Sequence, residues 1–327
     1  MTDTDTAAFP ALPVDSTADG DPRRTGVEIE FSGLSASEAA RIAAQTLGGT
    51  VRSSGENGWT VEGSEVGTLD LYLDTALRHA TDSPIKRIGL DIGKELIPVE
   101  IVTEPLTRQD LPRLDRLRSA LREAGAEGTR KGVTYGFGVH LNIGIASTDA
   151  AGITAPLIAY AVTEAWMRRV QPIDLSRQVL PFTDPYPTRL VRALCQAGFV
   201  SPTDAMDIYL EHANSRNYGL DMLPIFAWLE SDRVDVATGG ESAVKGRPAF
   251  HFRLPDCQID DADWSIRAEW DRWLLVETIA QDTALLDRLM REWDAAHSGL
   301  TLRRSPWANT CGDILAEAGV FTAEAAA

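Results

Sequence analysis

Positions 24–31 read Arg-Thr-Gly-Val-Glu-Ile-Glu-Phe. The apolar residues of this stretch alternate with Glu28 and Glu30, and this period of two predicts a β-strand with one apolar face and one acidic face. Two residues on the same face of a strand lie roughly 7 Å apart, because the rise is about 3.3 Å per residue. Carboxylates at that separation repel each other unless water, a cation or a basic side chain lies between them.

The same alternation recurs in short segments along the chain. Apolar residues alternate with polar ones between clusters of glycine, proline and polar turn residues, which is typical of half-buried strands. We predict strands at 26–32, 50–54, 58–62, 68–73, 98–103, 137–145 and 248–254. Because helices do not separate every pair of these strands, the pattern favours an antiparallel or mixed sheet.

Helical periodicity occupies the longer stretches between the strands. Ser35-Ala-Ser-Glu38 has the form of a capping box and predicts a helix that runs to about Leu47, where two glycines follow. Apolar residues three and four positions apart predict further helices at 110–124, 150–169 and 263–297. Strands and helices in this mixed order predict an α+β fold in which helices back the sheet.

The two ends of the chain differ from the middle. Residues 1–22 are rich in Thr, Asp, Ala and Pro and have no periodicity, so we predict a disordered acidic tail. The small residues at 321–327 predict a frayed C-terminal tail. No linker or internal repeat divides the residues between them, and we predict one domain at 23–320.

Composition and charge limit the classes of partner. The net charge of the 327 residues is −17, which argues against nucleic acid or an anionic membrane as a partner. No apolar run approaches the ~20 residues of a membrane helix, and the acidic N-terminus lacks the features of a secretory signal. We therefore expect a cytoplasmic protein. The three cysteines, at 195, 257 and 311, match no zinc or redox spacing.

Three later strands place single polar residues between apolar neighbours. These residues are Glu100, the pair His140 and Asn142, and the pair His251 and Arg253. Each has an ordinary explanation, because half-buried strands put charge toward water and most strand histidines are satisfied by a local partner. One sheet face that carries all of them beside the two acids of the first strand would instead suit divalent cations and phosphate.

The order of these segments resembles the amidoligases of the carboxylate–amine ligase superfamily, which are related to glutamine synthetase and glutamate–cysteine ligase. The similar pieces occur in family order and are Gly26-Val-Glu-Ile-Glu-Phe31, Val99-Glu-Ile-Val-Thr-Glu-Pro-Leu106, Gly138-Val-His-Leu-Asn142, Arg216-Asn-Tyr-Gly-Leu-Asp-Met222 and Phe250-His-Phe-Arg253. No single motif is long, so their order and spacing carry the resemblance.

The resemblance implies a fold, a reaction and cofactors. The fold would be glutamine-synthetase-like, with a curved, mostly antiparallel sheet backed by helices. ATP would phosphorylate a carboxylate, and an amine would displace phosphate from the acyl phosphate to form an amide, with Mg²⁺ or Mn²⁺ as cofactor. The acid and the amine would be small molecules, peptides or protein carboxylates, and their identity stays open.

The resemblance also implies residue roles. The expected metal ligands are Glu28, Glu30, Glu100, His140 and His251. The expected catalytic groups are Arg253, which would stabilise charge on the γ-phosphoryl group, and Arg216, which would bind phosphate or the substrate carboxylate. The expected nucleotide-binding or substrate-binding residues are Asn142, Asp221 and Glu62.

Three positions depart from the family pattern. His251 stands where the late strand usually carries an acid, Asp221 stands where Asn is common, and Glu62 stands where an Asp is usual. A histidine ligand shifts metal preference toward Mn²⁺ or Zn²⁺. Either the metal set has changed, or one metal site is weakened.

Other roles have several candidates. The base that takes a proton from the amine could be Glu62, Glu104 or Asp221. Loop residues Lys94, Arg130 and Lys131 could contact phosphate, although solvated charge explains them equally simply. A substrate pocket could use aromatic residues that at helical spacing more often fill the core, namely Trp166, Tyr218, Trp228, Trp264, Trp270, Trp273 and Trp293.

Two other functions compete with the ligase. A metal-dependent amide hydrolase could use the same carboxylates and histidines without ATP, although the chain has neither a His-Glu-x-x-His motif nor a catalytic triad pattern. A catalytically inactive ligase fold could serve as a binding module, and His251 in place of an acid favours that reading.

Overall fold

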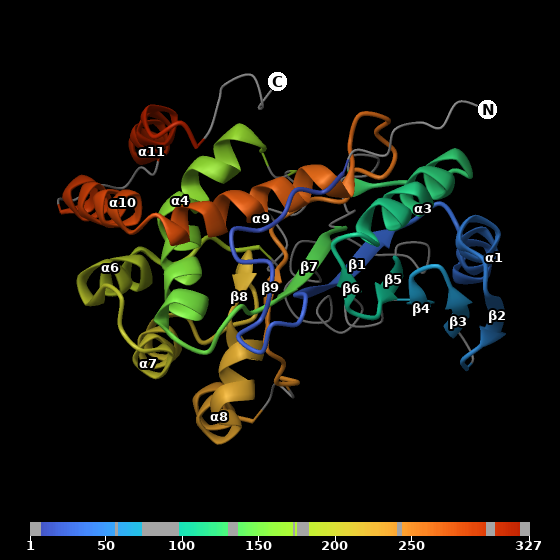
Figure 1. Ribbon diagram of the computed structural model, residues 1–327, viewed down its shortest axis with the longest axis horizontal. Coiled ribbons are helices and arrows are strands. Elements are labelled where there is room, and N and C mark those ends of the chain that lie inside the picture. The colour runs from blue at the N-terminus through green and yellow to red at the C-terminus, as the bar shows by residue number, and fades with distance from the viewer. Residues whose placement is uncertain are drawn as a thin grey trace, which may run out of the picture.

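The strands form one sheet. The computed structural model describes residues 8–55, 58–73, 98–129, 137–172, 174, 183–240, 244–298 and 305–320. Within these residues the strand order is β2-β3-β4-β5-β1-β7-β9-β8, and each neighbouring pair is antiparallel. This confirms the prediction of an α+β fold with a mostly antiparallel sheet (Figure 1).

The predicted strands are present with small shifts at their ends. The first strand, β1 (Arg24–Phe31), lies in the middle of the sheet. The strands on its β5 side are β2 (Thr50–Ser53), β3 (Gly58–Ser64), β4 (Gly67–Leu73), β5 (Val99–Thr103) and the short β6 (Leu106–Thr107). The strands on its other side are β7 (Val139–Gly144), β9 (Ala249–Phe252) and β8 (Leu220–Asp221).

The register of β1 brings the polar residues of four strands to one sheet face. Glu30 pairs with Glu100 of β5, and Glu28 pairs with His140 of β7. Asn142 of β7 in turn pairs with His251 of β9. Paired residues of an antiparallel ladder point to the same face. Val27, Ile29 and Phe31 of β1 point to the opposite face and are completely buried in the core.

Helices pack against that apolar face and extend the fold beyond β8. In Figure 1, α3 and α9 lie along one side of the sheet and α4 contacts α9, while α1 packs on β3 and β4. None of the helices in the described part of the chain combines the length and hydropathy that a membrane crossing requires. The helices are α1 (Ala36–Leu47), α3 (Leu111–Glu123), α4 (Ala155–Val170), α6 (Thr188–Ala197), α7 (Pro202–Ala213), α8 (Leu223–Thr238), α9 (Ile266–Gln281), α10 (Thr283–His297) and α11 (Ser305–Glu317).

The helix predictions are confirmed with one correction. The Ser35 hydroxyl accepts from the Glu38 N–H at 3.3 Å while the Glu38 carboxylate accepts from the Ser35 N–H at 2.9 Å, so the capping box is present. The single helix predicted at 263–297 is wrong. The chain leaves helical geometry at Asp282, whose side chain accepts from the Leu285 N–H and so begins a second helix.

The prediction of a disordered tail is wrong for residues 8–22. Phe9 and Leu12 are 2% and 5% exposed and belong to the hydrophobic core. The Phe9 ring meets the Trp270 ring edge-on at 6.1 Å, and the Trp270 indole N–H donates to the Pro10 carbonyl at 2.9 Å. Composition suggested disorder because the few apolar residues that anchor this segment have no periodicity. The predicted ends at 1–7 and 321–327 lie outside the described residues.

A buried ion pair fixes the point where this segment enters β1. The Arg23 guanidinium donates to both Glu277 carboxylate oxygens, at 2.8 and 2.6 Å, and their side chains are 3% and 6% exposed. It also donates to the Val14 and Gly144 carbonyls, at 2.6 and 2.8 Å. The N-terminal segment, β7 and α9 therefore meet at one side chain.

This pair has a matched surface counterpart, which gives a stability prediction. Arg52 and Glu62 also lie 2.6 Å apart, but their side chains are 62% and 51% exposed. Arg23→Ala should lower the free energy of unfolding by about 3–5 kcal/mol, because it leaves the Glu277 carboxylate buried and uncompensated. Arg52→Ala should change it by less than about 1 kcal/mol. Urea denaturation followed by circular dichroism measures both, and equal losses would contradict the role assigned to Arg23.

Candidate functional site

Five predicted metal ligands converge on one sheet face. We call Glu28, Glu30, Glu100, His140 and His251 the carboxylate–histidine cluster. Two groups of three within it have ligand atoms that all lie within 4.8 Å of one another: Glu28 with both histidines, and Glu30 with Glu100 and His140. Single metal ions take ligands at that mutual separation, so the donor set fits one or two divalent cations. Whether the residues bind metal stays a prediction.

His140 lies between the two groups. Its Nδ1 is 2.7 Å from Glu28 Oε2, and its Nε2 is 3.9 Å from Glu30 Oε1. Because a carboxylate at Nδ1 fixes the hydrogen on that nitrogen, the Nε2 lone pair is directed at Glu30 and is available to a metal ion. Glu30 is held in turn by the Gly138 N–H, which donates to its carboxylate at 2.7 Å.

His251 has the same arrangement on the other side of the cluster. Its Nδ1 is 3.3 Å from the completely buried Asp221 Oδ2, and its Nε2 is 3.8 Å from Glu28 Oε2. The Nε2 atom is buried, and none of the described residues forms a hydrogen bond with it. A buried polar atom without a partner is unfavourable, so this nitrogen fits a site that a metal ion completes. Asp221, predicted to bind nucleotide or substrate, lies behind His251 and holds it.

The charges of the cluster suit metal ligation. Burial raises the pKa of Glu28, but the adjacent imidazoles of His140 and His251 outweigh it and hold that pKa well below its usual range. Burial lowers the pKa of His140 against the opposing effect of Glu30 and Glu28. The carboxylate therefore stays ionised and the imidazole stays neutral near pH 7, and these are the forms that bind metal ions.

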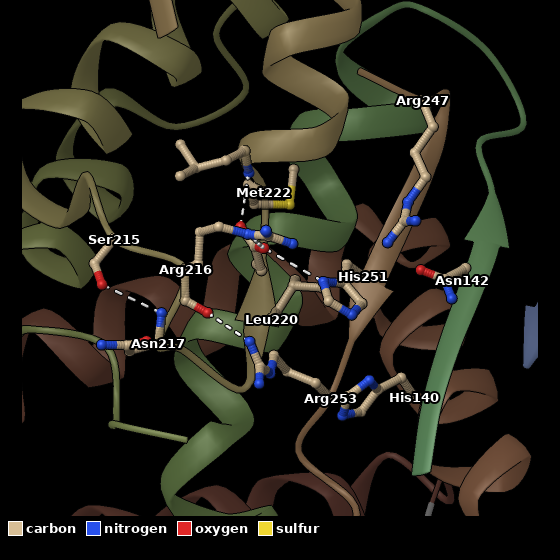
Figure 2. Close-up of polar contacts among 12 residues, drawn as sticks. His140, Asn142, Ser215, Arg216, Asn217, Leu220, Met222, Arg247, His251 and Arg253 are labelled. Atoms are coloured by element: carbon tan, nitrogen blue, oxygen red, sulfur yellow. Dashed lines mark hydrogen bonds and ion pairs between the residues drawn. The ribbon is translucent and has the colours of Figure 1, made fainter. Parts of the chain in front are cut away.

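Two arginines lie beside the cluster. The Arg253 guanidinium donates to the Arg216 carbonyl at 2.9 Å, and Arg216 Nε donates to Asp221 Oδ2 at 3.2 Å. Figure 2 shows Arg253 next to His140 and below His251, with the Arg216 side chain above Arg253 and to the left of His251. Both predicted catalytic arginines are thus close to the predicted metal ligands. Two guanidinium groups at one edge of the cluster suit an anion such as phosphate.

The sequence analysis missed one basic residue. Arg247 reaches the cluster from the chain just before β9, and its Nη2 lies 4.0 Å from Glu28 Oε1. Figure 2 shows its side chain directed toward Asn142 and His251. Asn142 itself donates to Glu28 Oε1 at 2.7 Å. Arg247 occupies an alternate position in phase with His251 and Arg253, so extending the strand pattern backwards would have found it.

Other predicted site residues lie elsewhere. Glu62 forms its ion pair with Arg52 on β2, and β4 separates its own strand β3 from β5. Glu104 accepts from the Thr68 N–H at 3.3 Å, just after the end of β5. Of the three candidate bases, the cluster therefore has only Asp221 close by, and that carboxylate is already bound by His251. The loop residues Lys94, Arg130 and Lys131 lie outside the described residues.

The chain is similar to a known protein family over most of its length. The model of a family described as "putative amidoligase enzyme" matches residues 21–275, which is more than half of the 327 residues. The chain belongs to this family. No curated protein matches it. The matched range contains the whole carboxylate–histidine cluster and all three arginines, so the amidoligase resemblance read from the sequence is confirmed.

The position of His251 in this amidoligase gives a metal-binding prediction. We expect His251→Ala to abolish high-affinity Mn²⁺ binding in calorimetry, because it removes a ligand. Asp221→Asn should weaken binding by about ten- to a hundredfold, because the amide no longer fixes the imidazole orientation. Glu65→Gln, which alters an exposed acid paired with Arg116, is the control and should bind Mn²⁺ like the wild type.

Circular dichroism should show that all three variants remain folded. Unchanged Mn²⁺ affinity in His251→Ala would mean that this histidine is a buried structural residue.

Proposed function

We propose that the chain is an ATP-dependent carboxylate–amine ligase that forms an amide through an acyl phosphate. The observation that carries the proposal is the convergence of three carboxylates and two histidines within ligand distance on one sheet face, with two arginines at its edge. Membership of the amidoligase family supports amide-bond formation. The substrates would be a small-molecule or peptide carboxylate and an amine.

Divalent cations would be held by the two halves of the cluster. Glu30, Glu100 and the Nε2 atom of His140 would form one set of ligands. Glu28 and the Nε2 atom of His251 would contribute to the other. Bound Mg²⁺ or Mn²⁺ would screen the negative charge of the ATP phosphates and of the transferring phosphoryl group. Two imidazole ligands favour Mn²⁺ over Mg²⁺, which prefers oxygen.

The chemistry has two steps. A substrate carboxylate oxygen attacks the γ-phosphorus, the bond to the β–γ bridging oxygen breaks, and ADP leaves. The amine nitrogen then attacks the acyl carbon, phosphate departs with the electrons of the C–O bond, and the amine loses a proton. Negative charge moves among the phosphoryl oxygens in both steps, so a fixed guanidinium stabilises the transition state. Arg253 would fill this role, and Arg216 would bind phosphate beside it.

Two rival functions differ in what they require. A metal-dependent amide hydrolase would cleave an amide without nucleotide, so dependence on ATP separates it from the ligase. An inactive scaffold has no need to keep a buried histidine nitrogen directed into the cluster. The geometry at His251 Nε2 therefore supports a working metal site over a degenerate one.

Arg253 provides the test of this mechanism. Arg253→Lys keeps the charge but loses the planar fork, so we expect turnover to fall by roughly ten- to a thousandfold. The assay is ATP-dependent phosphate release with Mn²⁺ or Mg²⁺ across a panel of amino-acid and peptide acids with amines. Arg291→Lys, an exposed arginine paired with Asp287 on α10, is the control and should leave turnover unchanged.

Turnover at the wild-type rate in Arg253→Lys would contradict the role of Arg253 in stabilising the phosphoryl group, and would assign that role to Arg216. Amide cleavage without ATP would contradict the ligase function and support the metal-dependent hydrolase.

A further inference from the structure

A cavity of about 990 Å³ adjoins the carboxylate–histidine cluster at Glu28. Glu28 and Asn142 line it, and so does Arg247, so it opens directly onto the ligands of the predicted metal site. Pockets that enclose a drug-sized ligand have roughly 300–1,000 Å³. The cavity is therefore at the upper end of that range, which is more space than one free amino acid needs.

Small residues on the sheet face make room for the cavity. Gly26 pairs with Asn142, and Gly144 pairs with Ala249, all on the face that carries Glu28 and His251. A Cβ atom at Gly26 would meet the Asn142 Cβ at 3.4 Å, an ordinary contact, whereas a Cβ atom at Gly144 would meet the Arg24 carbonyl oxygen at 3.0 Å. A larger side chain at position 26 is therefore absent without steric need. The floor of the cavity is thus bare backbone and a methyl group where the rest of the face carries long polar side chains.

The N-terminal segment builds one wall of the cavity. Thr17, Asp19 and Asp21 line it. A turn holds them, because the Thr17 N–H donates to the Asp21 carbonyl at 2.8 Å and the Gly20 N–H donates to the Thr17 carbonyl at 2.9 Å. The buried Arg23 anchors the end of this turn. The wall is therefore fixed to the core, and two carboxylates give it negative charge.

Two polar atoms beside the cavity lack partners. Arg247 Nε and Asn142 Oδ1 are buried, and neither forms a hydrogen bond within the described part of the chain. The first is a cationic donor that suits a carboxylate, and the second is an acceptor that suits an N–H group. A ligand that satisfies both must carry a carboxylate and an N–H donor a short distance apart. The C-terminal residue of a peptide carries both on one Cα atom.

We propose that the cavity binds the C-terminal residue of a peptide, which is the acid substrate of the ligase. This inference rests on the proposed function for the fate of the carboxylate. The guanidinium of Arg247 holds that carboxylate beside Glu28, and Asn142 Oδ1 accepts from the peptide N–H of the same residue. The preceding residues lie along the wall formed by Asp19 and Asp21, so uncharged or basic residues fit there.

The test compares two libraries of N-acetylated tetrapeptides of random sequence, one ending in a carboxylate and the other in a carboxamide. The immobilised full-length protein is loaded with Mn²⁺ and a non-hydrolysable ATP analogue, and retained peptides are measured by mass spectrometry. We expect the acids to be enriched at least tenfold over the amides. Arg247→Ala should remove the enrichment, so that acids and amides are retained about equally, because the charge-assisted hydrogen bond to the carboxylate is lost. Arg291→Ala is the matched control and should keep the enrichment.

A second variant tests the cavity itself. Ala249→Phe places a ring on the cavity floor and should abolish peptide retention while Mn²⁺ binding persists, which also shows that the variant is folded. Equal retention of acids and amides, or enrichment that survives Arg247→Ala, would overturn the proposal. Displacement of the peptides by an equimolar mixture of free amino acids would assign the cavity to a single amino acid instead.

Calorimetry with the ATP analogue separates this proposal from the proposed function. Nucleotide binding without enrichment of acids would support the proposed ligase function and contradict the proposed peptide site. Enrichment of acids without nucleotide binding would support the proposed peptide site and contradict the proposed ligase function.

Discussion

One face of the sheet must accommodate buried carboxylates at the centre of the fold. Glu30 and Glu100 pair directly across β1 and β5 and are 9% and 8% exposed, and Glu28 lies two residues away on the same strand. Burying ionised groups is unfavourable unless donors or opposite charges surround them. Here hydrogen bonds from the Gly138 N–H, Asn142 and His140 supply part of that compensation. The negative charge that remains on this face suits a cation.

Each imidazole of the cluster is oriented by its own carboxylate. Glu28 holds His140 and Asp221 holds His251, in both cases through Nδ1. Each Nε2 atom is consequently directed into the cluster, which is the arrangement by which second carboxylates orient histidine ligands in metal sites. His251 therefore has a buried partner, Asp221, that fixes its orientation.

The carboxylate–histidine cluster and the adjoining cavity share their structural support. Arg23 joins the N-terminal segment, β7 and α9 through one guanidinium group, and the wall of the cavity follows from that anchor. His251 lies in β9, and Arg247 and Arg253 lie just outside its two ends. The three residues are separated by even numbers of positions, so they share one face. In the proposed mechanism they would bind a carboxylate, a metal ion and phosphate in that order, and a substrate lying along this segment would pass from cavity to nucleotide.

The features that could be predicted from the sequence are those that depend on interactions between near neighbours in the chain. The alternation at 24–31 fixed a strand with acids on one face, the capping box at Ser35 fixed the start of α1, and the polar positions of the later strands fixed which residues share a face. The strand and its faces follow from the alternation of apolar and polar residues, and the start of the helix follows from hydrogen bonds between near neighbours. The order of the motifs was sufficient to identify the family.

Which side chains contact one another across the fold could not be predicted from the sequence, because it depends on tertiary packing. The register that sets Glu28 opposite His140, the place of Asp221 behind His251 and the break at Asp282 all depend on packing. The clearest case is the N-terminal segment, which by composition resembles a disordered tail. Its order comes from residues far along the chain, such as Glu277, which lies 254 positions from Arg23. No local pattern encodes such a contact, because the free energy that orders the segment is gained only when distant surfaces meet.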